Sequence, residues 1–192
     1  LSIFSIYAQA STGSLEKSRI LFRFPVSEIS TDRTNLEVPA SGSVDFYLRL
    51  YNAKHPFTVP RKFTLAVDPV TASWDEGSGV DSDTYSDVGI SNWIMARSSS
   101  TEGNVAWAHQ GGDMYTGSYV VGSTLPHYTY YMDRGYEDLS LDITSLVEEW
   151  LVGTDDNNGL AVYLTSSVEN ALSSSYVKKF FARGSEYFFK RP

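Results

Sequence analysis

Acidic side chains gather in one short stretch of the chain, between Trp74 and Asp83. Hard oxygen ligands on a glycine-rich loop are the kind of site that binds Ca²⁺. The alternative is a solvated turn in which the Asp side chains hydrogen-bond to their own backbone, and we favour that turn over a calcium site. The four carboxylates that would hold the calcium ion are Asp75, Glu76, Asp81 and Asp83.

The histidines and the other carboxylates show no spacing that indicates catalysis. His55, His109 and His127 lie far apart, without the short spacing that zinc sites use. Glycoside hydrolysis needs two carboxylates at a fixed separation, and the 23 acidic residues form no distinguishing motif for it. Nucleophile-elbow, phosphate-loop and dinucleotide-binding motifs do not occur. We therefore predict a protein without enzymatic activity or a cofactor, with a polysaccharide-degrading enzyme as the weakest alternative.

Aromatic side chains are the strongest candidates for binding. Such rings, set in loops, could stack on sugars, anchor a protein interface or plug the loops onto the core, and these alternatives stay open. The candidates for an interface or a glycan site are Trp93, Trp107, Tyr115, Tyr119 and Tyr130.

Composition excludes several classes of partner. The net charge is −8 and the pI about 4.8, which disfavours nucleic acid and anionic membrane surfaces. Cysteine is absent, so disulfides and thiolate chemistry are excluded. The chain has no apolar run long enough for a membrane-spanning helix. The aromatic content of 14% suits the core of a β-sandwich.

Alternating apolar residues predict the elements that must position these side chains. The clearest strand is 43–52, and 18–25, 63–68 and 159–165 alternate in the same way. Further strands are expected at 1–8, 104–108, 177–182 and 186–190, with long loops at about 70–135. The pattern predicts one all-β domain over 1–192, an antiparallel jelly-roll-like sandwich. Because the chain begins at Leu1 and not at Met, we expect a fragment of a longer chain.

One stretch changes its period and predicts a short helix near residues 145–152. Residues 138–143 alternate as a strand does, after which apolar residues recur at helical spacing up to Leu151. Ser145 and Glu148 fit a capping box, and Gly153 stands where helices often stop. We expect Trp150 to be buried on the inner face of this helix.

Several short segments together resemble the DNRLRE-type β-sandwich, a family related to disaggregatase modules and to a class of carbohydrate-binding modules. The segments are Ser18-Arg-Ile-Leu-Phe-Arg-Phe24, Phe46-Tyr-Leu-Arg-Leu-Tyr51, Ser73-Trp-Asp-Glu-Gly77, Asp142-Ile-Thr-Ser-Leu-Val-Glu-Glu-Trp150, Asn158-Gly-Leu-Ala161 and Phe180-Phe-Ala-Arg-Gly-Ser-Glu186. More narrowly, Ser145–Leu151 and Phe180–Pro192 resemble a group of structural proteins of tailed bacteriophages.

The resemblance implies a virion component that is repeated by symmetry. We therefore expect a non-enzymatic structural protein of the phage surface or tail, a homo-oligomer that contacts other virion subunits. The alternative is an extracellular or cell-surface carbohydrate-binding module that recognises a surface polysaccharide. The two hypotheses overlap, because a virion protein can also touch host glycans.

Overall fold

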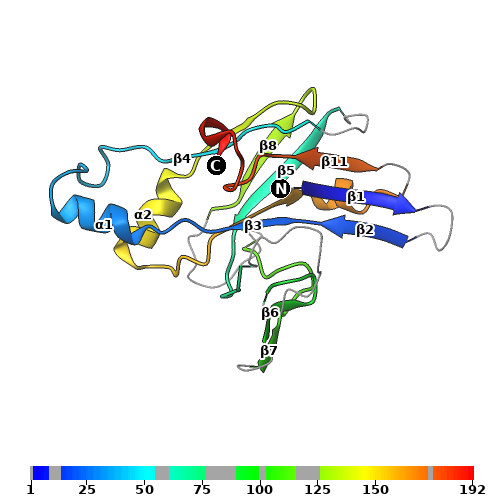
Figure 1. Ribbon diagram of the computed structural model, residues 1–192, viewed down its shortest axis with the longest axis horizontal. Helices are drawn as coiled ribbons and strands as arrows, with labels where there is room; N and C mark the ends of the chain where they lie inside the picture. The colour runs from blue at the N-terminus through cyan, green and yellow to red at the C-terminus, as the bar shows by residue number, and fades with distance from the viewer. Residues whose placement is uncertain are drawn as a thin grey trace.

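Antiparallel strands with a few short helices make up the chain, and the computed structural model describes residues 2–8, 14–54, 61–76, 90–99, 103–115, 126–172 and 175–192 (Figure 1). The strands are β1 Ser2–Ala8, β2 Ser14–Ser18, β3 Ile20–Phe22, β4 Tyr47–Leu50, β5 Phe63–Pro69, β6 Met95–Ser99, β7 Gly103–Ala106, β8 Tyr128–Met132, β9 Leu139–Asp142, β10 Leu160–Leu164 and β11 Tyr176–Lys179. The helices are α1 Ser27–Thr34, α2 Thr144–Val152 and α3 Ser166–Glu169, and Phe188–Lys190 forms a 3₁₀ turn. The predicted all-β class is confirmed. Within the described ranges, no helix has the length and apolar character needed to cross a bilayer.

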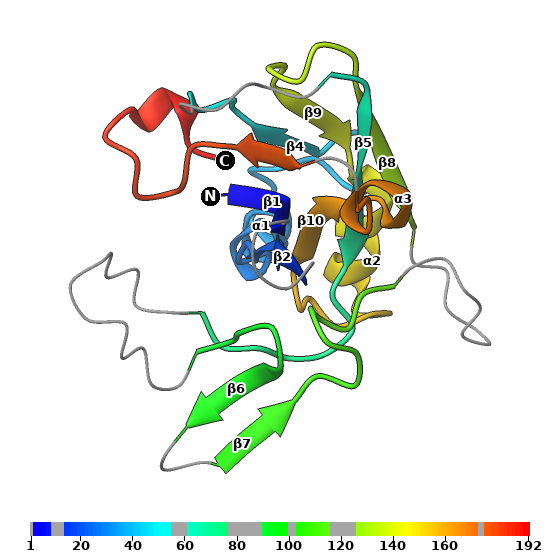
Figure 2. The same ribbon diagram turned by 90° about the vertical axis from the view of Figure 1, so that its right-hand side faces the viewer.

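The strands form two layers that face each other across a common core. One layer is the four-stranded sheet β3-β10-β5-β8, in which all neighbours are antiparallel. The other contains β11-β1-β2 and the β4-β9 pair. Backbone hydrogen bonds from Ala53 N to Lys179 O (2.9 Å) and from Phe181 N to Tyr51 O (3.0 Å) carry β11 onto the end of β4. The two ladders therefore continue into one another and lie opposite the four-stranded sheet (Figure 2).

Alternation along β5 and β10 builds a separate cluster on each face of the four-stranded sheet. Leu65, Val67 and Val162 point to the inner face, where they pack with the apolar side of α2. Ala66 and Tyr163 point to the outer face, against the segment that contains the β6–β7 hairpin. Burial on both faces explains why every residue of β10 is apolar and buried.

Helix α2 confirms the predicted helix near 145–152, but the predicted capping box is wrong. The Glu148 carboxylate does not reach back along its own helix and instead pairs with Arg33 of α1 at 2.6 Å. Asp142 Oδ1 accepts the hydrogen bond from Thr144 N (2.9 Å) and so satisfies the start of the helix. Gly153 ends it at φ 78°, as predicted, and Trp150 is buried with 7% exposure.

Other elements differ from the prediction. The range expected as loops, about 70–135, contains β6 and β8 as well as β7, which overlaps the strand expected at 104–108. Tyr128–Met132 is rich in strand-forming aromatic residues, and pairing with β5 orders it. The strand expected at 186–190 is a 3₁₀ turn, because Tyr187, Phe188 and Phe189 are consecutive aromatics without alternation. Helix α1 buries no residue and has no apolar stripe, so periodicity could not indicate it.

Candidate functional site

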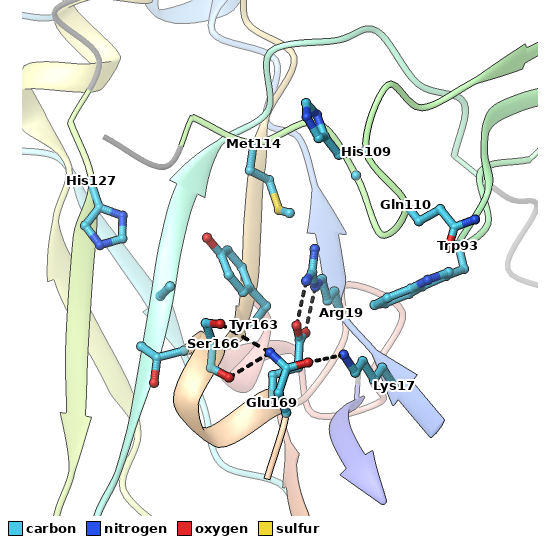
Figure 3. A pocket seen from close by; sticks show the side chains of 14 residues that line it. Lys17, Arg19, Trp93, His109, Gln110, Met114, His127, Tyr163, Ser166 and Glu169 are labelled. Carbon is cyan, nitrogen blue, oxygen red and sulfur yellow. Dashed lines mark hydrogen bonds and ion pairs between the residues drawn. The ribbon is translucent and has the colours of Figure 1, made fainter. Parts of the chain in front are cut away.

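A pocket of about 780 Å³, lined by both polar and apolar side chains, lies on the outer face of the four-stranded sheet. Ala66 of β5 and Tyr163 of β10 lie in its wall, and β2, α3 and the 90–115 segment supply other parts (Figure 3). Titratable and aromatic side chains converge here from segments that are far apart in sequence. This convergence makes the pocket the first candidate for a binding site.

Arg19 ties three segments together beside the pocket. Its Nε and Nη2 donate to the two carboxylate oxygens of Glu169 at 2.7 and 2.6 Å, and its Nη1 donates to Gly111 O at 3.2 Å. The guanidinium also lies between two rings, 5.0 Å from the centroid of Trp93 and 4.9 Å from that of Tyr163 (Figure 3). The planar cation is therefore held by charge, hydrogen bonds and ring faces together.

Gly111 is required where the 90–115 segment closes over Arg19. Its φ is +90°, and a Cβ at this position would lie 2.8 Å from Arg19 Nη1 and 2.9 Å from the Trp93 ring. A side chain would therefore push the loop away from the guanidinium. The close approach of this backbone is what positions Trp93 over the pocket.

A buried carboxylate organises the second part of the pocket. Asp68 is fully buried on β5, and its two oxygens take different partners. Oδ1 lies 2.6 Å from His127 Nδ1, and Oδ2 accepts the hydrogen bond of the Tyr163 hydroxyl. Burial raises the pKa of Asp68, although both hydrogen bonds oppose that rise. Burial and the neighbouring carboxylate also raise the pKa of Tyr163.

The His127 contact with Asp68 decides what the imidazole offers to the pocket. A neutral imidazole that donates its Nδ1 hydrogen to the carboxylate leaves the Nε2 lone pair as an acceptor. The side chain is 38% exposed and lines the pocket, so a ligand can reach it. In that neutral tautomer the imidazole is a hydrogen-bond acceptor whose orientation is held by a buried group.

The other wall presents donors and an amide. Lys17 Nζ donates to Asn170 Oδ1 at 2.5 Å, and Asn170 Nδ2 donates to Ser166 O at 2.8 Å. Each carboxylate of the site already accepts hydrogen bonds at both oxygens, from Arg19 or from His127 and Tyr163. The pocket therefore offers hydrogen-bond donors at one wall, while the oxygens of its two carboxylates already have partners.

The four predicted aromatic residues that the structure describes do not share one site. Trp93 lines the pocket, whereas Trp107 is 6% exposed and donates its Nε1 hydrogen to Asn92 O (2.8 Å), so it plugs the loop onto the sheet. Tyr115 is half-buried. Tyr130 packs against the main core, and its hydroxyl donates to Asp138 O at 3.1 Å. Tyr119 lies outside the described residues.

The predicted calcium ligands have other partners where the structure describes them. Asp75 lies 3.8 Å from Arg97, and Glu76 pairs with Arg183 at 3.0 Å. Asp81 and Asp83 lie outside the described residues. Among the residues that the structure describes, no group of three or more His, Asp or Glu side chains could hold a metal ion.

The sequence prediction missed Arg19, Asp68, His127 and Glu169 as site residues. A signal existed for Asp68, because a carboxylate inside an apolar strand needs a partner when it is buried. Arg19 precedes Ile20, which is buried in the main core, so alternation already placed Arg19 on the opposite face. Glu169 and His127 carried no comparable pattern, since each reaches the pocket through the fold.

A second candidate surface lies at the C-terminal end. Tyr187, Phe188 and Phe189 are 47%, 73% and 60% exposed. Consecutive exposed aromatic rings of this kind are typical of protein–protein contacts. Figure 2 shows this segment standing out to one side of the sandwich.

Comparison of the chain with protein-family models, with curated proteins and with solved structures finds no match.

Proposed function

We propose that this chain is a non-enzymatic structural protein of a virion, a jelly-roll-like sandwich that acts through contacts with neighbouring subunits. The observation that carries the proposal is the exposed aromatic surface of Tyr187, Phe188 and Phe189. Large apolar side chains exposed side by side cost solubility unless another protein covers them. The resemblance of Phe180–Pro192 to tailed-phage structural proteins supports the same function from the sequence.

The test is whether the chain occurs in assembled particles. Mass spectrometry of purified virions should find it in several copies, and chemical cross-linking should join Lys190 to a neighbouring subunit. Lys17, which lies at the pocket, serves as the matched control and should show fewer such cross-links. Absence of the chain from purified particles would refute the proposal.

A second candidate function is recognition of a surface polysaccharide by an extracellular or cell-surface module, and the Arg19 pocket favours it. Trp93 supplies an aromatic ring, Lys17 supplies donor hydrogens and His127 supplies an acceptor to a pocket large enough for a sugar unit. Sugars are bound by this combination of a ring face and directed hydrogen bonds. A virion protein with such a pocket would bring a host glycan to the particle.

Calorimetry with neutral and acidic oligosaccharides tests this candidate. Trp93→Ala should weaken binding by roughly tenfold or more, as loss of a central aromatic contact does. Tyr131→Ala is the control, because Tyr131 is 57% exposed and does not line the pocket. Equal affinity in wild type and Trp93→Ala would exclude this pocket as the sugar site.

A further inference from the structure

The buried amine of Lys178 lies in direct contact with the side-chain amide of Asn52. Lys178 is fully buried, and its Nζ donates a hydrogen bond to Asn52 Oδ1 at 2.8 Å. Because a carbonyl bond is about 1.23 Å long, Nζ lies within about 4 Å of Asn52 Cγ. An amine and an amide carbon are therefore held close to the separation of about 3–3.5 Å from which reacting atoms form a bond.

The backbone fixes the position of these two side chains. Asn52 forms a β-bridge with Phe180, and Ala53 N donates to Lys179 O at 2.9 Å, so the segment after β4 is paired with the end of β11. Lys178 and Phe180 are two positions apart in an extended segment and face the same side of it. Phe180 is 1% exposed in the main core, and its ring centroid lies 4.9 Å from Lys178 Nζ. The amine is thus held in place and shielded from water.

The surroundings of Lys178 favour a nucleophilic amine. Its other two hydrogen bonds go to Gly135 O at 3.1 Å and to Glu137 O at 2.7 Å, so all three acceptors are neutral. Burial lowers the pKa of Lys178 to about 8, against the opposing effect of Glu137 and Asp138, and an uncharged amine is then available near neutral pH. When the hydrogen that faces Asn52 is lost, the other two keep their acceptors and the nitrogen lone pair points to the amide.

A carboxylate for the proton transfers lies in the turn before β9. Glu137 Oε2 is buried and has no hydrogen-bond partner among the described residues, while Oε1 accepts from Arg134 N at 2.5 Å. Burial opposes ionisation of this carboxyl, but backbone hydrogen bonds within 133–137 outweigh that effect and lower its pKa. Glu137 also acts on the charge of Lys178 more strongly than Asp138 does. An ionised carboxylate with an unpartnered oxygen near the amine is a base that can accept its proton.

We propose that Lys178 and Asn52 form an isopeptide bond within the folded chain. Lys178 Nζ attacks Asn52 Cγ, a new C–N bond forms, the Cγ–Nδ2 bond breaks, and the amide nitrogen leaves as ammonia. Glu137 accepts the proton that the attacking nitrogen loses and passes it to the leaving nitrogen, so the reaction needs no oxidant, reductant or co-reactant. The bond joins residues 126 positions apart and ties β11 to the end of β4, which restricts the unfolded chain as a long disulfide loop does. It is independent of both proposed functions, because the reacting groups belong to the folded chain alone.

Intact mass spectrometry tests the inference on folded protein that is incubated at pH 8, near the pKa of Lys178, and then denatured. The mass of wild type should fall below that of the sequence by one ammonia molecule, and tryptic digestion should release a branched peptide that joins Asn52 to Lys178. Lys178→Arg keeps the positive charge without a reactive amine and should keep the full mass. Glu137→Gln keeps both reacting groups and should slow the loss of ammonia by about a hundredfold or more. The branched peptide of wild type decides the test even where a variant does not fold.

Two control variants exclude other origins of the mass change. Lys179→Met removes a neighbouring lysine, and Asn158→Ser removes an Asn-Gly pair that can itself lose ammonia by closing a succinimide, so both should still show the loss. A wild type that keeps the full mass, a loss that maps to another residue, or an equal rate in Glu137→Gln and wild type overturns the inference. Until the bond forms, Lys178 keeps an amine that titrates, so effects of that titration on stability are measured on protein of full mass.

Discussion

Lys178 provides a sharp test of the structure, because its charged group is fully buried. Its Nζ donates to Asn52 Oδ1 at 2.8 Å, to Glu137 O at 2.7 Å and to Gly135 O at 3.1 Å. These three acceptors are neutral, so they satisfy the donors without neutralising the charge. Burial therefore lowers the pKa of Lys178 from 10.5 to about 8, although the nearby Glu137 and Asp138 partly oppose the change.

The expected effect on stability follows from proton binding in the two states. The unfolded chain binds a proton at Lys178 up to a pH near 10.5, while the folded chain releases it near pH 8. Between these values the unfolded state holds more protons, so the free energy of unfolding rises with pH. Each pKa unit corresponds to about 1.4 kcal/mol, so the full rise is about 3 kcal/mol and disappears as the pH falls through 8.

Lys178→Met removes this titration and leaves a side chain of similar length. At pH 7 its unfolding free energy differs from that of wild type for two opposed reasons, which are relief from burying a charge and three acceptors left unfilled at about 1–3 kcal/mol each. The size of that difference at one pH therefore does not test the argument. The test is how the difference changes with pH. Denaturant unfolding between pH 7 and 10.5 should show wild type gaining about 3 kcal/mol relative to Lys178→Met, with other titrating groups cancelling in the difference.

Lys179→Met is the matched control for loss of a lysine from the same strand, because the Lys179 side chain is only half-buried. A difference between wild type and Lys178→Met that does not change with pH would show that the ammonium reaches water in the folded state. The burial argument for Lys178 would then be wrong.

Three further substitutions test the core and the pocket. Trp150→Ala should lower the free energy of unfolding by about 3–5 kcal/mol in denaturant titrations, and Trp150→Phe by clearly less, since no hydrogen bond to Nε1 is lost among the described residues. Gly159→Ala should cost about 2–4 kcal/mol in the same titrations, because φ is +85° and the new Cβ would lie 2.3 Å from Phe22 O. Arg19→Met should cost about 3–5 kcal/mol by removing the cation that pairs with the Glu169 carboxylate, whose side chain is 5% exposed, and adding Glu169→Gln should recover part of it. Equal stability of Arg19→Met and wild type would contradict the buried pair.

The spacing of apolar residues was the main source of the strands and the helix that the sequence predicted correctly. The alternation found in 18–25 and 43–52 agrees with the burial of Ile20 and Leu48 in the main core. The change of period after residue 143 located α2, and Gly153 marked its end. These features are local, since a face of a strand or helix repeats at a fixed spacing whatever it packs against. The strand predicted at 186–190 was wrong because its consecutive aromatic residues do not alternate and so define no face of a strand.

Contacts between residues that are far apart in the chain could not be predicted from any local sequence pattern. Glu148 looked like a capping residue until the fold brought Arg33 within 2.6 Å of it. Trp93 and Trp107 looked equivalent in sequence, yet one lines the pocket and the other plugs the loop. An ion pair and the burial of a ring depend on where two remote segments meet, and the sequence around either residue does not contain that information.

The sequence by itself therefore determined the all-β class, helix α2 and an acidic chain free of cysteine. Tertiary structure alone decided the candidate site. Arg19 and Glu169 are 150 residues apart, and Asp68 and His127 are 59 apart, yet each pair is in contact. Strand order in the sheet places these side chains on one face, and strand order is set by long-range pairing and not by the period of any one strand.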